Sequence, residues 1–302
     1  MIEAVGLAKR FGERRAVDDL SFNIRPGVVT GFLGPNGAGK STTMRLMLGL
    51  DHGAGVTTFN GQRFREIERP MRRVGVLLEA KAFHPTRTAR NHLLMLAAAN
   101  AIPAKRADEV LTLVGLDSVA SKKPKTFSLG MGQRLGLAAA LLGEPEFLLL
   151  DEPANGLDPQ GITWLRDFLK AYAAAGRTVF ASSHLLAEIE LMADHLIVIG
   201  QGRLLADTPI ADFVAQSSHT SVVVRTPDGE RLAELLRAQG AIVTIEAKGG
   251  LSLTGVSQEQ VGELAFVERV LLHELTTKVA TLEEAFLEAT AGTQDFGTGG
   301  VA

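Results

Sequence analysis

The sequence predicts an α/β fold with a parallel sheet covered by helices on both faces, followed by a smaller α+β domain. Two observations favour the first part: short apolar strands alternate with helical segments to about residue 215, and a glycine-rich loop joins one strand directly to a helix. After this point the order of the expected elements becomes β-α-β-β-α-β. A length of 302 residues agrees with two domains, at about 150 residues each.

Composition excludes several classes of protein. A hydrophobic content of 46% is enough for a buried core and excludes a wholly disordered chain. The formal charge of −3 excludes a strongly basic nucleic-acid binder, and aromatic residues at 5% argue against base-stacking surfaces, so no nucleic-acid partner is expected. The absence of cysteine excludes disulfides and thiol chemistry. Mean hydropathy is high at +0.14, yet no apolar stretch approaches the roughly 20 residues that a spanning helix needs.

Apolar runs and turn residues place the elements of the first domain, which we expect to cover residues 1–215. Strands are expected at residues 2–7, 16–24, 28–33, 74–78, 147–150, 178–182 and 196–199. Helices are expected at residues 42–50, 162–175 and 185–193, and within the mainly helical stretch 88–142, which Pro103 and Pro124 interrupt.

A polar connector, residues 216–220, precedes the second domain, which we expect to cover residues 220–290. Strands are expected at 221–225, 241–247, 251–254 and 270–275, with helices at 230–239 and 258–268. This order is the ferredoxin-like arrangement. A last helix, 282–289, precedes residues 291–302, whose glycine and threonine content predicts a disordered tail.

The loop that follows strand 28–33 has the composition of a phosphate-binding loop. Residues 34–41, GPNGAGKS, match G-x-x-x-x-G-K-[ST] at every fixed position. Glycines let backbone N–H groups approach phosphate oxygens, and the helix that begins there adds its positive end. Lys40 is expected to reach the β and γ phosphates of a nucleotide, and Ser41 to bind Mg²⁺. The other expected phosphate-binding residues are Gly34, Asn36, Gly37, Gly39 and Thr42.

Two carboxylates follow the apolar strand 147–150, at the end of the sheet where ligands gather in α/β folds. Asp151 is placed to hold Mg²⁺, directly or through water. Glu152 is placed to take a proton from an attacking water molecule.

A third motif, FSLGMGQ at residues 127–133, lies between these two and opens an apolar helix. Here the sequence resembles the nucleotide-binding subunits of ATP-binding-cassette (ABC) transporters, whose signature is usually written LSGGQ. The resemblance implies a P-loop cassette with an antiparallel β subdomain and a helical subdomain at about residues 81–142. It also implies that Ser128, Gly130 and Gln133 contact ATP held by a second subunit. Ser128 is equally a good helix N-cap, and the two roles do not compete.

Further positions follow the family pattern in order. Asp158, in NGLDP, resembles the residue of the D-loop that faces the partner subunit, and His184 resembles the histidine that contacts the γ-phosphate. Phe11 stands where the family commonly stacks an aromatic ring on adenine.

Glu79 departs from the pattern, because many family members carry glutamine there. Glutamate at this position resembles the subgroup of ABC ATPases that serve antibiotic and multidrug exporters. A carboxylate can still contact Mg²⁺ or the attacking water, although its charge makes the contact unlike that of an amide.

The resemblance implies an ATPase that uses ATP and Mg²⁺, with Lys40, Glu152 and His184 as catalytic residues. Two copies would sandwich two ATP molecules and power efflux of a drug, antibiotic or lipid-like substrate through a separate membrane permease. The expected location is cytoplasmic, on the inner face of the membrane.

The alternative is a non-transport ABC ATPase that acts as an ATP-dependent regulatory or resistance protein. A translation-factor type normally carries two cassettes, whereas each motif occurs once in this sequence. A DNA-repair type needs a long coiled coil between the phosphate loop and the signature, and the interval between Lys40 and Ser128 leaves no room for it. For the C-terminal domain, regulation, dimerisation and partner binding all remain open.

Overall fold

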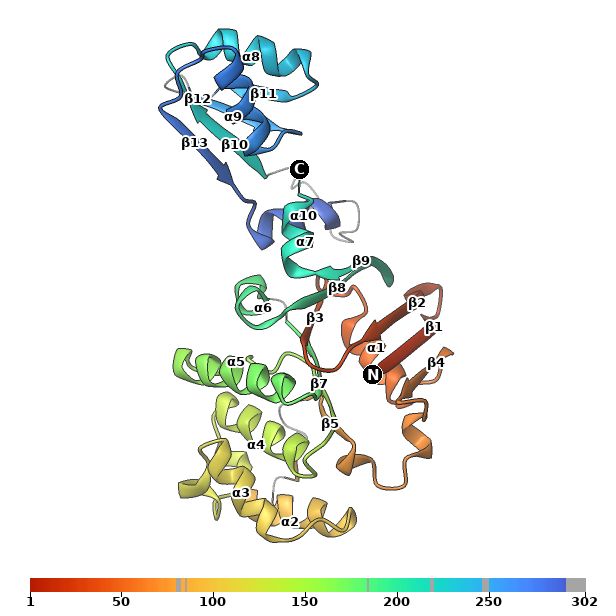
Figure 1. The fold of residues 1–302 in the computed structure, drawn as a ribbon. Helices are drawn as coiled ribbons and strands as arrows, with labels where there is room; N and C mark the ends of the chain where they lie inside the picture. The colour runs from red at the N-terminus through yellow and green to blue at the C-terminus, as the bar shows by residue number, and fades with distance from the viewer. Residues whose placement is uncertain (80–82, 85, 184, 218–219, 246–249, 292–302) are drawn as a thin grey trace, which may run out of the picture. The chain divides into compact units, whose positions relative to one another are not determined.

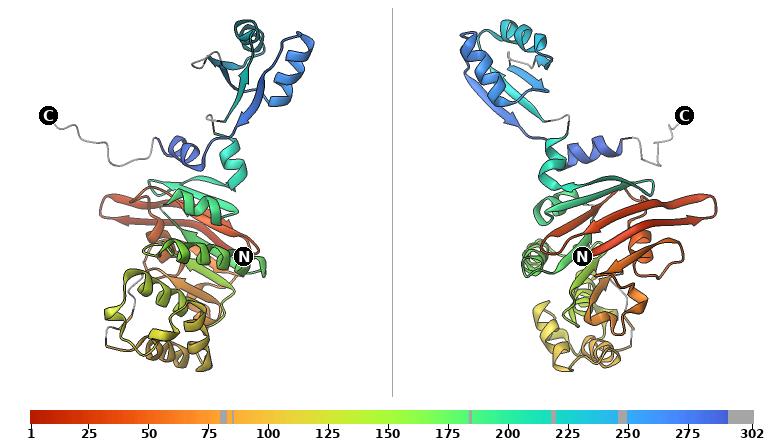
Figure 2. Two further views of the ribbon diagram at one scale, coloured as in Figure 1. Left: turned by 90° about the vertical axis from the view of Figure 1, so that its left-hand side faces the viewer. Right: turned by 45° about the vertical axis from the view of Figure 1, so that its right-hand side comes forward.

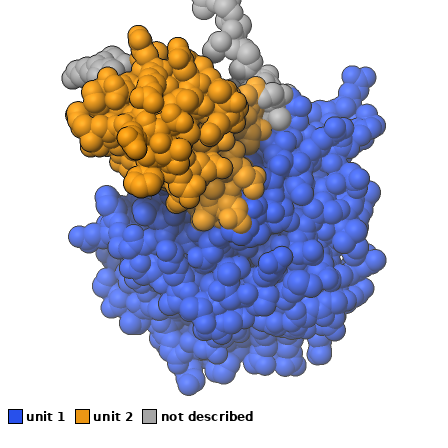
Figure 3. Space-filling model, turned by 45° about the horizontal axis from the view of Figure 1, so that its top comes forward, with its two compact units in different colours: residues 1–209, 292–302 blue, residues 210–291 orange. Residues whose placement is uncertain are grey.

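The computed structural model describes residues 1–79, 83–84, 86–183, 185–217, 220–245 and 250–291. Within them the chain forms two compact units, which divide between Pro209 and Ile210 (Figure 3). Helix α7 (Ile210–Ala215) therefore belongs to the second unit, although the sequence analysis assigned these residues to the first domain.

The central sheet of the first unit has the strand order β5-β6-β7-β3-β8-β9. The strands are β3 (Val29–Leu33), β5 (Val74–Leu77), β6 (Phe147–Leu150), β7 (Thr178–Ser182), β8 (His195–Gly200) and β9 (Arg203–Pro209). All neighbours pair in parallel except β9, which is antiparallel to β8. Helices α1 (Lys40–Met47), α5 (Pro159–Ala174) and α6 (Leu186–Met192) accompany this sheet (Figure 1). The predicted fold class is confirmed.

A second, antiparallel sheet has the order β2-β1-β4. It comprises β1 (Ile2–Phe11), β2 (Arg14–Ile24) and β4 (Ala54–Phe59). Its apolar face packs into the same core as the central sheet, where Ile24, Phe32 and Phe59 are fully buried. The sequence analysis missed β4 because Gly55, which has a positive φ of 85°, and two consecutive threonines interrupt its apolar pattern.

The helical subdomain comprises α2 (Ala89–Ala99), α3 (Lys105–Leu113) and α4 (Leu129–Leu141). These helices are separated close to Pro103 and Pro124, as predicted. Short 3₁₀ turns lie at Phe64–Glu66, Pro70–Arg72, Asp117–Val119 and Pro124–Thr126. In both Figures 1 and 2 helices α2 and α3 lie at the end of the first unit away from β1 and β2.

The second unit has its own four-stranded antiparallel sheet, with the order β11-β12-β10-β13. Its elements are β10 (Ser221–Arg225), α8 (Gly229–Ala238), β11 (Ile242–Ile245), β12 (Gly250–Thr254), α9 (Gln258–Val267), β13 (Glu274–Lys278) and α10 (Leu282–Thr290). Each β-α-β unit is split by a strand of the other, as in a ferredoxin-like domain. Strand β13 begins later than predicted, because pairing of Arg225 with Glu274 sets its register.

None of the helices in the described part of the chain is both long and apolar enough to cross a membrane.

Candidate functional site

The phosphate-binding loop lies between β3 and α1, and its glycines are required by backbone conformation and space. Gly37 and Gly39 have φ of 82° and 107°, which side chains with a Cβ rarely adopt. A Cβ on Gly39 would lie 2.3 Å from the carbonyl oxygen of Ala16, and one on Gly34 would lie 2.6 Å from that of Ile199. The loop is therefore held against both sheets of the first unit.

Lys40 lies inside this loop and is only 8% exposed. Its Nζ donates to the carbonyl oxygen of Gly34 at 2.6 Å and lies 3.5 Å from that of Pro35. Burial lowers the pKa of the Lys40 ammonium group, while the negative charges of Glu152 and Asp151 act in the opposite direction. The two carboxylates and the ammonium group therefore share one electrostatic environment.

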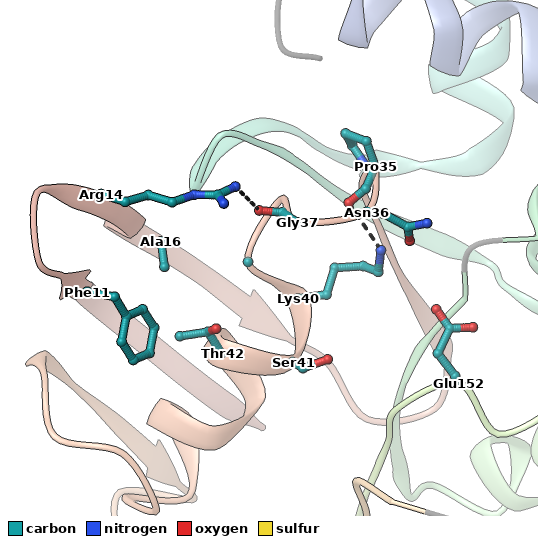
Figure 4. Close-up of a pocket in the computed structure, with 11 residues that line it drawn as sticks. Phe11, Arg14, Ala16, Pro35, Asn36, Gly37, Lys40, Ser41, Thr42 and Glu152 are labelled. Carbon is teal, nitrogen blue, oxygen red and sulfur yellow. Dashed lines mark hydrogen bonds between the residues drawn. The ribbon is translucent and has the colours of Figure 1, made fainter. Parts of the chain in front are cut away.

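A cleft of about 620 Å³ opens over the loop (Figure 4). In the picture Phe11 lies near Thr42 on one side, Glu152 lies on the other side, and Lys40 and Ser41 lie between them. The lining residues are Phe11, Arg14, Ala16, Pro35, Asn36, Gly37, Gly39, Lys40, Ser41, Thr42 and Glu152. The structure thus brings one end of β1, the phosphate loop and the residue after Asp151 to a single cavity.

The aromatic ring expected to stack on adenine stands at the mouth of this cleft. Phe11 is 54% exposed, and Lys9 Nζ lies 4.9 Å from its ring centroid. Arg14, which the sequence analysis did not select, donates from its guanidinium group to the carbonyl oxygen of Gly37 at 3.3 Å. An arginine after a strand turn carries no motif, so only its place in the fold reveals it.

Hydrogen bonds at the ends of β5, β6 and β7 hold the segment that carries the paired carboxylates. Asp151 N–H donates to the carbonyl oxygen of Leu77 at 2.7 Å. The buried Ser182 hydroxyl donates to Asp151 Oδ1 at 2.5 Å and accepts from Glu152 N–H at 3.0 Å. Glu152 has a φ of 50°, a left-handed conformation that is sterically disfavoured for a residue with a Cβ. Ser182 escaped the sequence analysis, which weighed only His184 in that segment; His184 itself lies outside the described residues.

The signature residues lie at the start of α4. The Ser128 hydroxyl accepts from Met131 N–H at 3.2 Å and caps the helix, and Ser128 itself is exposed. A Cβ on Gly130 would lie 2.5 Å from the carbonyl oxygen of Gly156, so the helix touches the segment that follows Glu152. Asp158 caps α5 by accepting from Gly161 N–H at 2.9 Å, and its side chain is 63% exposed.

Gln133 is placed differently from these exposed residues. Its side chain is 3% exposed, and its Nε2 donates to the main-chain carbonyl oxygen of Glu152 at 2.8 Å. The Gln133 amide therefore points into its own subunit, toward the segment that carries the predicted base.

Glu79 is not among the residues that line the cleft. It is exposed and borders a second, mainly apolar groove of about 270 Å³ between the sheet and the helical subdomain. Its negative charge acts on Arg45 of α1, where it helps to raise the pKa of the guanidinium group after the larger contribution of Asp51.

The donors in the cleft fit a magnesium ion that comes with a nucleotide. Among the described residues there is no group of three or more His, Asp or Glu that could hold a metal ion. Mg²⁺ in nucleotide sites needs only one or two protein oxygens, because phosphates and water supply the rest. The Ser41 hydroxyl and the Asp151 carboxylate are oxygen ligands of this kind. Ser41 belongs to the phosphate loop, and Asp151 directly precedes the cleft-lining Glu152.

Comparison with known proteins gives consistent results. The ABC transporter family model matches residues 17–155, and a family model of unknown function matches residues 220–283. The chain is 37% identical over 300 residues to a bacitracin transport ATP-binding protein of Bacillus licheniformis, covering 97% of this chain and 98% of the relative. It is 35% identical over 208 residues to a lantibiotic transport ATP-binding protein of Streptococcus pyogenes, covering 68% of this chain and 90% of the relative. A solved ATP-binding subunit of an ABC transporter superposes with a TM-score of 0.65 at 28% identity, covering 72% of this chain and 92% of that one.

Proposed function

The chain belongs to the family of ABC transporter ATP-binding proteins and is an ATPase, and on this premise we propose that it powers export of an antibiotic, drug or lipid-like compound through a separate membrane permease. The cleft that joins Phe11, the phosphate loop and Glu152 carries the ATPase part of the proposal. Relatives named for transport of bacitracin and lantibiotics support the substrate class.

ATP would bind with its adenine on Phe11 and its phosphates in the loop. Backbone N–H groups of residues 37–42 and the start of α1 would contact the phosphate oxygens, together with the Lys40 ammonium group. Negative phosphate charge beside Lys40 favours the protonated amine, so nucleotide binding would raise the pKa that burial lowers in the free protein.

Ser41 and Asp151 would hold Mg²⁺, which neutralises charge on the phosphates when it is bound. Glu79 borders the neighbouring groove, and its contact with the metal or the attacking water remains part of the proposal.

Hydrolysis would use Glu152 as the base that accepts a proton from the attacking water. Its main chain is held from both sides, at N–H by Ser182 and at the carbonyl oxygen by Gln133. This preorganisation places a carboxylate at the edge of the cleft opposite Phe11. His184, which follows β7 in the sequence, would contact the γ-phosphate.

Two copies would close around two ATP molecules. Ser128 at the start of α4 and Asp158 at the start of α5 are both exposed. An exposed helix N-terminus is suited to bind a phosphate of ATP held by the opposite subunit. Each composite site would then use the phosphate loop of one chain and residues 128–130 of the other.

The Glu152→Gln variant tests both the role of Glu152 as the base and the ATP-sandwich dimer. We expect turnover to fall by about 10²- to 10⁴-fold, because general-base catalysis contributes about that much. We also expect ATP to convert the variant from monomer to dimer in size-exclusion chromatography. Glu190→Gln changes an exposed carboxylate that does not line the cleft and should preserve turnover. Unchanged turnover would contradict the role of Glu152, and a monomer at saturating ATP would contradict the sandwich.

We propose the apolar groove beside Glu79 as the contact for the permease, which would hold the chain at the inner face of the membrane. Val76, Leu96 and Ala139 contribute to it from β5, α2 and α4, so a bound segment would touch both the sheet and the helical subdomain. Closure of the dimer would move such a segment.

A charge in this groove tests that contact. Leu96→Glu should abolish co-purification of a polytopic membrane protein with this chain, while the ATPase activity of the purified protein is preserved. Leu113→Glu, at an exposed position on α3 outside the groove, should leave co-purification intact. If no such membrane protein co-purifies with the wild-type chain, the regulatory or resistance ATPase becomes the better explanation.

A further inference from the structure

We propose that Gln133 is a positioning residue that couples the signature helix α4 to the catalytic Glu152 of the same chain. The inference rests on the proposed function, because it assigns a role inside the ATP sandwich. It gives Gln133 a task other than the contact with ATP that the sequence predicts.

The contact itself is buried and directed at the main chain. Gln133 is 3% exposed, and its amide donates to the carbonyl oxygen of Glu152 at 2.8 Å. A side chain enclosed to this degree has no surface to offer to a nucleotide on a second subunit. Its hydrogen bond instead satisfies a carbonyl group of the segment that carries the base.

Glu152 needs such support because its backbone is strained. A φ of 50° is disfavoured for any residue with a Cβ and persists only where neighbours enforce it. The N–H group of Glu152 donates to Ser182 Oγ at 3.0 Å, and its carbonyl oxygen accepts from Gln133 Nε2 at 2.8 Å and from Asn155 N–H at 3.1 Å. Without Gln133 the carbonyl oxygen keeps the local contact with Asn155 N–H, but it loses its hydrogen bond to helix α4 and with it the link through which a shift of the helix reaches Glu152.

Helix α4 also contacts the residues that follow Glu152. Gly130 approaches so closely that a Cβ there would lie 2.5 Å from the carbonyl oxygen of Gly156. Arg134 Nη2 lies 3.4 Å from Asp158 Oδ1. The first two turns of α4 therefore contact residues 152–158 at three points, so a shift of the helix would displace the backbone of Glu152.

This arrangement connects the two composite sites of the proposed dimer. Ser128 and Gly130 at the start of α4 would bind the γ-phosphate of ATP on the partner, whereas Gln133, farther along the helix, holds the base for ATP in its own subunit. Occupancy of one site would thereby set the geometry of the carboxylate in the other.

The test is Gln133→Met, which keeps the length and apolar stem of the side chain and removes the donor. We expect kcat to fall by about 10- to 100-fold because the base is misplaced, with KM for ATP changed by less than about twofold. In a Glu152→Gln background, Gln133→Met should leave ATP-driven dimerisation as strong as in Glu152→Gln alone. Gln133→Leu, which also lacks the donor, should repeat the loss of kcat if the methionine variant folds poorly.

Leu137→Val serves as the control for loss of packing, because Leu137 is buried on the same helix. It should lower the melting temperature without changing kcat. The proposal is overturned if Gln133→Met and Gln133→Leu retain wild-type kcat, or if Gln133→Met raises KM or abolishes dimerisation in the Glu152→Gln background. If Glu152→Gln by itself keeps full turnover and stays monomeric with ATP, the proposed function fails instead, and the two failures are distinguished.

Discussion

Lys40 at the start of α1 and Glu152 after β6 reach the same cleft, and each is held in a state that costs free energy. Lys40 is a buried ammonium group whose pKa is lowered by desolvation, and Glu152 has a left-handed backbone. Costs of this kind concentrate at functional sites, where a bound ligand or a fixed geometry compensates for them. At the scale of single residues, the site is therefore built at the expense of stability.

This cost predicts a pH dependence that can be assigned to Lys40. Since burial lowers its pKa in the folded state, the folded protein releases this proton at a lower pH than the unfolded chain does. The unfolded state then holds more protons, and stability rises with pH up to the ordinary lysine pKa of about 10.4. Lys40→Met removes this contribution. The unfolding free energy of the wild type minus that of the variant should therefore increase as the pH rises above neutral. Denaturant titrations at several pH values measure the difference, and a difference that does not vary with pH would refute the assignment.

At the scale of elements, close approach of β5 to its neighbours depends on one glycine. A Cβ on Gly75 would lie 2.2 Å from the carbonyl oxygen of Ala140 on α4 and 2.7 Å from Pro145. Because the first contact is with backbone, it cannot be relieved by rotating a side chain. Gly75 also borders the proposed permease groove, so the packing of β5 on α4 shapes that surface.

We expect Gly75→Ala to destabilise the protein by about 1–3 kcal/mol through overpacking. Thermal unfolding followed by circular dichroism measures this loss. Gly262→Ala is the matched control, because a Cβ there, within α9, would meet only Leu275 Cδ2 at 3.5 Å. Helix propensity predicts a gain of about 0.5–1 kcal/mol for that change. Equal effects of the two substitutions would show that close packing at Gly75 is unimportant.

At the scale of the whole molecule, each unit has its own hydrophobic core. One core joins the two sheets of the first unit, and the other packs Val224, Leu232 and Leu253 within the second. All residues that line the nucleotide cleft lie in residues 1–209. The division predicts that nucleotide binding does not require the second unit.

Two fragments test this independence. Residues 1–209 should fold and bind ATP with an affinity within about threefold of the full chain, since no lining residue is lost. Residues 210–291 should unfold in a single cooperative transition by themselves. Isothermal titration calorimetry and circular dichroism give the two measurements. Loss of ATP binding by the shorter chain would mean that the second unit supports the cleft.

The sequence by itself determined the fold class, the phosphate loop, the paired carboxylates and the family. These features depend on neighbouring residues in the chain: hydrophobic periodicity, glycine at fixed spacing, and strands that end in acidic residues. Strands β4 and β9 were missed because their pairing, and not a local pattern, makes them strands.

Only the tertiary structure decided which distant residues meet. It placed Arg14 on the phosphate loop, Ser182 between Asp151 and Glu152, and Gln133 on the carbonyl group of Glu152. It also placed Glu79 beside an apolar groove and not among the residues that line the cleft, and the contact of Glu79 with Mg²⁺ stays a prediction. A side chain's partner depends on strand order and helix packing, which arise from burial summed over the whole core, and no short segment contains that information.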